Sequence, residues 1–251
     1  MSSIAISLIA LAFVFGGALP GIYLRKVLPD HHVSADSRGL VMLGTGLVGT
    51  MAAIVLGMMV SSAKASYDTQ RNNLTVMSSK VILLDRVLAH YGPETNQSRE
   101  LLRKAVQHVL DRVRPKDGSR ADLVPAATGT NEPLYDQILA LSPTDDTQRA
   151  LRNQAINLAM DLGEMRWLMI EQASASAAPL FLVILTFWFA IIFVSFGLYT
   201  PPNSTVITSL FVCTLSVAGA ILLVLELYKP YEGLIQLSSA PLRDVLAHLG
   251  K

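Results

Sequence analysis

The stretch GLVMLGTGLVGTMAAIVLGMMVSS, residues 39–62, contains no charged side chain and no proline. A helix that crosses the hydrocarbon core of a bilayer needs about 20 consecutive, mostly apolar residues. This stretch is long enough to do so. Since charge-free runs of this length are typical of transmembrane helices rather than of soluble domains, it places the chain in the membrane class.

Three further stretches have the same character. Residues 4–24 precede Arg25 and Lys26, and they lack the basic start and small-residue cleavage site of a signal peptide, so we expect a retained helix. Residues 178–199 and 206–225 flank a short turn that contains two prolines and forces an antiparallel hairpin. The sequence therefore predicts an all-α, polytopic membrane protein with four transmembrane helices.

The overall composition agrees with this class. Charged residues make up 16% of the 251 residues, whereas soluble domains carry about 25%. The net charge of +1 provides no basic field that would attract nucleic acid. The single cysteine, Cys213, lies in an apolar stretch and excludes an intrachain disulfide.

Between the second and third spans, residues 64–177 carry a helical pattern. Apolar residues at alternating steps of three and four form a first seam: Leu74, Met77, Val81, Leu84, Leu88 and Tyr91. A second seam has the same spacing: Leu151, Ala155, Leu158, Leu162, Met165 and Met169. Such spacing places each set on one helix face. Since no breaker separates either seam from its neighbouring span, we expect two long helices that pack as a stalk.

Smaller elements lie between the two seams. One short helix carries Leu102, Val106, Val109 and Val113 on one face, and Ser142 and Pro143 are predicted to begin the helix of the second seam. A run of basic residues is interleaved with acids and predicts a solvent-exposed face. Its members are Arg99, Arg103, Lys104, Arg112, Arg114, Lys116 and Arg120.

These patterns predict four segments. They are a first transmembrane hairpin at 1–63, a helical cytoplasmic stalk domain at 64–177, a second hairpin at 178–227 and a cytoplasmic C-terminal tail at 228–251. Four spans place both termini and the stalk domain on one side. More basic residues lie near the membrane on that side, namely Lys64, Arg71, Arg166, Lys229 and Arg243. The opposite side has Arg25, Lys26 and Arg38. By the positive-inside rule, both termini are expected in the cytoplasm, with the protein in a bacterial inner membrane.

The second span carries a face of small and weakly polar residues, which we call the small-residue face: Gly46, Gly49, Thr50, Ala53, Gly57 and Ser61. The run from Gly44 to Gly49 matches G-x-G-x-x-G, but a dinucleotide site needs a preceding strand, and none is predicted. Two interpretations stay open. The face packs against another helix, because small residues let backbones approach closely, or it lines a pore in an oligomer.

Other candidate residues lie at the ends of spans. Asp30, His31 and His32 follow the first span, and Glu226 and Lys229 close the fourth. Adjacent histidines point to different faces and have no further ligand at useful spacing, so no metal site is predicted. These residues are candidates for a headgroup-level or pH-sensing role. No spacing suggests a catalytic triad or a cofactor site, and we expect no enzymatic activity.

Several short motifs resemble those of the bestrophin-like family of bacterial and plant membrane proteins. They are LPDHH at 28–32, SR at 37–38, GTGL at 44–47, SAK at 62–64, YDTQ at 67–70, LLDRVL at 83–88, LELYKPYEGL at 225–234 and SAPL at 239–242. The resemblance covers nearly the whole chain. It implies a distant relation to bestrophins, which are pentameric anion channels, and hence a homo-oligomer, a pentamer, that passes small anions.

Two alternatives to an anion channel stay open. One is a membrane scaffold or stress-related protein that conducts nothing. The other is a stator-like proton channel, since flagellar stators also have two spans, a large cytoplasmic segment and two more spans. Such a channel usually needs an acidic group at mid-membrane depth, and these spans carry none.

Overall fold

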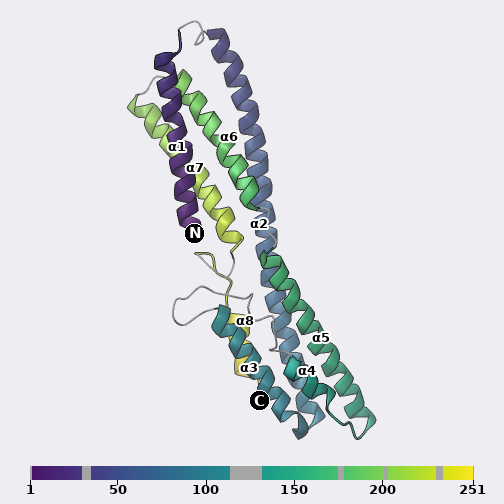
Figure 1. Cartoon of the computed structure of the whole chain (residues 1–251). Coiled ribbons are helices and arrows are strands. Elements are labelled where there is room, and N and C mark those ends of the chain that lie inside the picture. The colour runs from purple at the N-terminus through teal and green to yellow at the C-terminus, as the bar shows by residue number, and fades with distance from the viewer. Residues whose placement is uncertain are drawn as a thin grey trace. The chain divides into compact units, whose positions relative to one another are not determined.

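The computed structural model describes residues 2–29, 35–113, 132–174, 178–200, 203–229 and 234–250. Every regular element within these residues is a helix (Figure 1). Four of the helices are long and apolar enough to cross a membrane: α1 (Ser3–Val27), α2 (Ala35–Tyr91), α6 (Ala178–Tyr199) and α7 (Ser204–Leu227). The predicted all-α fold with four candidate spans is therefore confirmed.

The chain forms two compact units. The first, the membrane unit, comprises Met1–Ser66 and Ser176–Tyr228. The second, the helical unit, comprises Tyr67–Ala175 and Lys229–Lys251. Helix α2 belongs to both, since it continues for 57 residues without a break. This confirms that the second span continues directly into the first seam.

In the membrane unit, α1 lies against α6 and α7 (Figure 1). Val14 of α1 packs with Ile192 and Phe193 of α6 in a small buried cluster. The two helices approach most closely at glycines: a Cβ added to Gly21 would collide with the carbonyl oxygen of Val194. The sequence prediction of small-residue packing covers only the second span, so this crossing was not predicted.

The same crossing constrains a second glycine from the other side. A Cβ added to Gly197 of α6 would collide with the carbonyl oxygen of Ala18 in α1. Gly17, four residues before Gly21, also lies close, since its added Cβ would be 3.1 Å from the carbonyl oxygen of Ala190. The four-residue spacing of Gly17 and Gly21 is the sequence signal that could have revealed the contact.

We expect Gly21→Ala to push α1 and α6 apart. Because backbone rather than a flexible side chain blocks the added methyl group, the overpacking should cost about 1–3 kcal/mol or more. Thermal melting of the purified protein in detergent measures this loss. Gly16→Ala is the matched control in the same helix, since nothing lies within 4 Å of its added Cβ. Equal melting temperatures for the two variants would contradict the crossing.

The helical unit contains the rest of α2 and five shorter elements. They are η2 (Pro93–Thr95), α3 (Asn96–Val113), α4 (Glu132–Leu139), α5 (Asp146–Ser174) and α8 (Ala240–His248). One core contains buried residues of both seams, with Leu84 fully buried and Ala155 1% exposed. Lys80 of α2 also pairs with Asp161 of α5, Nζ to Oδ2 at 2.7 Å. The two seams therefore pack into one core, as their spacing predicts.

The start of α5 differs from the prediction. Asp145 caps the helix, because its Oδ1 accepts a hydrogen bond from the backbone N–H of Gln148 at 2.7 Å. Ser142 and Pro143 lie before the helix. A charged carboxylate satisfies the free N–H groups of a helix start and also interacts favourably with the helix dipole. The predicted Ser142 cap is therefore wrong by three residues.

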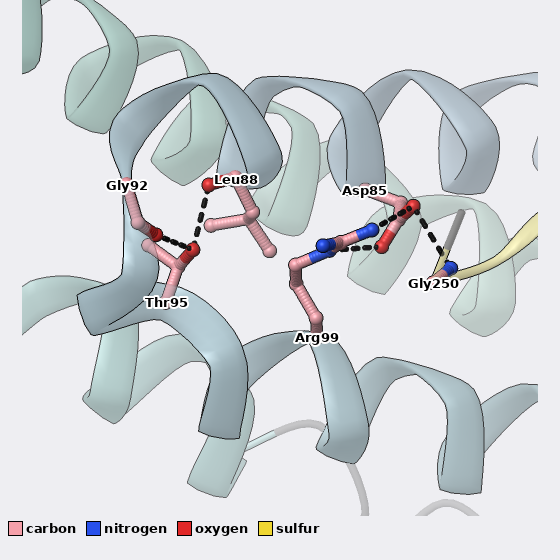
Figure 2. Close-up of polar contacts among 6 residues, drawn as sticks. All are labelled: Asp85, Leu88, Gly92, Thr95, Arg99 and Gly250. Carbon is pink, nitrogen blue, oxygen red and sulfur yellow. Dashed lines mark hydrogen bonds and ion pairs between the residues drawn. The ribbon is translucent and has the colours of Figure 1, made fainter.

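A buried ion pair joins α2 to α3 (Figure 2). Arg99 donates to both carboxylate oxygens of Asp85, from Nε at 2.8 Å and from Nη2 at 3.0 Å. The side chain of Asp85 is 3% exposed, and the bonds to it raise the pKa of the Arg99 guanidinium above its usual range. Arg99 is thus not part of the solvent-exposed basic face that its sequence context predicts, whereas Arg103 and Lys104 are exposed.

The turn between α2 and α3 and the end of the chain complete this region. Gly92 adopts a φ of 135°, a conformation that favours glycine. Thr95 Oγ1 lies 2.6 Å from the carbonyl oxygen of Leu88 and 2.8 Å from that of Gly92 (Figure 2). The backbone N–H of Gly250 donates to Asp85 Oδ2 at 3.4 Å. Residues 240–250 therefore pack into the core of the helical unit, where Leu242, Val245 and Leu249 are buried.

Candidate functional site

The membrane portion of α2 differs from the other spans in how little of it the chain covers. Only 6% of its most apolar window is buried, against 28% in α1, 33% in α6 and 39% in α7. Lipid or another protein surface therefore covers most of so apolar a surface.

One stripe of α2 faces its own chain. Ala52, Met59 and Ala63 are buried, at spacings of seven and four residues that place them on one side of the helix. Gly49 lies at the edge of this stripe, where its added Cβ would be 3.9 Å from Cδ1 of Ile192 in α6. These contacts within the subunit therefore lie on one side of α2.

The rest of the small-residue face is uncovered. Its exposed members are Gly46, Thr50, Ala53, Gly57 and Ser61. Nothing lies within 4 Å of a Cβ added to Gly46 or Gly57. Thr50 Oγ1 donates to the carbonyl oxygen of Leu47 at 2.8 Å, so its proton is used within the helix. Within the described part of the chain, these five residues therefore do not pack closely against another helix.

A stripe of large apolar residues runs along the other exposed side of α2. It consists of Leu40, Leu43, Leu47, Met51, Ile54 and Met58, of which the least exposed is Met51 at 48%. At 3.6 residues per turn, this stripe and the small-residue face lie on neighbouring sectors of one helix. The helix therefore presents a narrow side and a bulky side, and their shapes are complementary.

The predicted polar residues at the span ends have different locations. Glu226 is 3% exposed within the membrane unit, and its headgroup-level role stays a prediction. Two residues later, the Tyr228 hydroxyl donates to Ser62 Oγ of α2 at 3.3 Å. Lys229 is half-buried, and Asp30, His31 and His32 lie outside the described residues. Across the described part of the chain, no three His, Cys, Asp or Glu residues form a group that could hold a metal ion.

The comparisons with known proteins identify the family. The family model of the bestrophin-like domain matches residues 12–242. No curated protein matches the sequence. The fold is similar to the crystal structure of a mutated bacterial bestrophin homolog from Klebsiella pneumoniae, with a TM-score of 0.66 and 14% sequence identity. That match covers 96% of this chain and 97% of the other. The chain is therefore a membrane protein that belongs to the bestrophin-like family.

Proposed function

We propose that this protein is one subunit of a homo-oligomeric anion channel, in which α2 helices surround the ion pathway. The observation that carries the proposal is the uncovered membrane portion of α2, of which 6% is buried in a single chain. Membership of the bestrophin-like family supports the same conclusion. By this likeness the oligomer is a pentamer, and small anions are its substrates.

Helix geometry suggests what each exposed sector of α2 contacts in the oligomer. The helix has one side against its own chain, so its two flanks meet neighbouring copies and the remaining side faces the ring axis. On one flank lie the small residues Gly46 and Ala53, and on the other lie Met51 and Met58. The bulky flank of one copy therefore fits the narrow flank of the next, which is a head-to-tail contact that closes a ring.

The sector between the two flanks faces the pathway. Thr50 and Ser61 lie in this sector and supply its polar groups, with Gly57 beside them on the narrow side. Residues 39–62 contain no acidic side chain that would repel an anion. The small-residue face thus contributes both to contacts between copies and to the lining of the pore, and the two interpretations of its sequence apply to different edges of it.

The orientation is part of the proposal. We place both termini and residues 64–177 in the cytoplasm and the protein in a bacterial inner membrane, because Lys and Arg near the membrane are more numerous on that side. Reporter fusions that fluoresce only in the cytoplasm, placed after Lys251, test this orientation. An active periplasmic reporter at the same position would reverse it.

Purified protein in planar bilayers tests the proposed conduction. Under a tenfold chloride gradient, we expect currents that reverse near the chloride equilibrium potential, about 59 mV from zero. Native mass spectrometry of the same sample should give five chains. An assembled protein without current would favour a scaffold, and reversal toward the potassium or proton potential would contradict anion selectivity.

A further inference from the structure

The outer face of α5 changes character along the helix. In its first half this face carries mainly exposed polar residues, including Asn153, Gln154 and Asn157, and Met160 is exposed at 57% in the middle of the helix. In its last turns Trp167 and Leu168 are exposed, at 59% and 46%. The second seam of α5 packs in the core of the helical unit, and Trp167 and Leu168 are not among the residues of that core.

The exposed pair lies close to the membrane along the chain. Trp167 precedes Ala178, the first residue of α6, by about three helical turns of sequence. Leu234 is 72% exposed, and it follows the end of α7 at Leu227 by about two turns of sequence. Two of the three segments that connect the helical unit to membrane spans therefore expose large apolar side chains, and the third segment is α2.

The charges around the pair indicate what covers it. Glu164 and Glu171 are both exposed. Glu164 lies three residues before Trp167 and Glu171 lies three residues after Leu168, so this spacing places all four side chains on one face of the helix. A dry contact with another protein would have to remove the exposed Glu164 carboxylate from water, which is unfavourable. The hydrated headgroup layer of a bilayer accepts apolar rings and charged groups together, and tryptophan is enriched there.

We infer that Trp167 and Leu168 of α5, together with Leu234, contact the lipid headgroup layer and anchor the helical unit on the membrane surface. The indole ring buries its apolar body among the glycerol groups, while its N–H donates to lipid oxygens or interfacial water. The partner is the bilayer in which the spans lie. This anchor does not depend on conduction.

The two tryptophans of the chain make the contact measurable. Trp188→Phe leaves Trp167 as the only tryptophan, and Trp167→Phe leaves Trp188 of α6 as a reference within a membrane span. The full chain is reconstituted in phosphatidylcholine vesicles that carry a nitroxide either on the headgroup or deep in the acyl chain. We expect the headgroup nitroxide to quench Trp167 at least twofold more than the deep one, with the reverse order for Trp188.

Aqueous iodide separates the other outcomes. Quenching of Trp167 by iodide but by neither nitroxide would place it in water, and quenching by none of the three would mean that protein covers it. Either result overturns the inference. Leu168→Ser should at least halve the headgroup quenching of Trp167, whereas Leu83→Ser on α2 should not change it. Leu83 is the matched control because it is also 46% exposed. An equal effect of both variants would also overturn the anchor.

Discussion

In the Leu84→Asp variant, the helical unit should unfold at a much lower denaturant concentration than in the unchanged protein. Leu84 is fully buried in the core that contains both seams. An aspartate there loses its hydration without gaining a partner, and the neighbouring buried carboxylate of Asp85 already uses Arg99. We expect a loss of about 3–5 kcal/mol in the free energy of unfolding, measured by circular dichroism during denaturation in detergent.

The adjacent position gives a matched control for that loss. Leu83→Asp introduces the same carboxylate one residue earlier, where the side chain is 46% exposed. We expect a change of about 0.5 kcal/mol or less, as is usual for surface positions. Similar losses for the two variants would mean that the first seam does not hold the core together.

Gly57→Leu should remove at least nine tenths of the current of the assembled channel. Gly57 lies on the exposed side of α2, with nothing within 4 Å of an added Cβ. A leucine from every copy would place a ring of apolar side chains at one level of the pathway, and such a ring excludes water from a constriction. Bilayer recordings measure the current, and native mass spectrometry of the same sample measures the assembly.

The two measurements together locate Gly57. Lost current with an unchanged mass places it in the pathway, and a reduced mass places it in the contact between copies. Gly219→Leu on α7 is the control, because nothing lies within 4 Å of its added Cβ either and it is exposed on another span. If Gly57→Leu changes neither mass nor current, this side of α2 faces lipid and the proposed ring is wrong.

The sequence was sufficient to predict the features that depend on residues close to one another along the chain. A charge-free run predicts a span from its length alone, and steps of three and four predict which side of a helix is buried. Leu74, Leu84 and Leu158 are therefore found in the core where the spacing placed them. The unbroken helix through residues 63 and 64 follows for the same reason, since no local signal ends it.

Features that depend on distant residues could not be predicted in this way. Asp85 and Arg99 lie on different helices, and Arg99 stands among basic residues whose pattern is that of a solvated surface. The spacing of Gly17 and Gly21 signals a close helix contact, but it does not reveal that Gly197 of α6 lies opposite Gly21. The docking of α8 likewise depends on the shape of a core that other elements form.

The sequence predicted which residues form the candidate site, but it did not predict what those residues contact. Small residues at four-residue spacing identified the face of α2, but spacing alone does not distinguish a helix contact from a pore. The structure adds that Gly46 and Gly57 meet no other part of the described chain. In the proposed oligomer, the groups that complete the site belong to other copies, so the contacts of one subunit do not give their positions.

Chemical modification of Thr50 tests most directly whether α2 lines the ion pathway. Cys213 is the only cysteine and is exposed on α7, so Cys213→Ser gives a background without thiols. In that background, Thr50→Cys channels are treated with a negatively charged thiol reagent, and mass spectrometry measures how fast the cysteine is labelled. We expect most of the current to be blocked over the same time as the labelling. The same reagent should not affect Leu215→Cys on α7, which is 53% exposed. Complete labelling of Thr50→Cys with an unchanged current would contradict the proposal that this face lines the pathway.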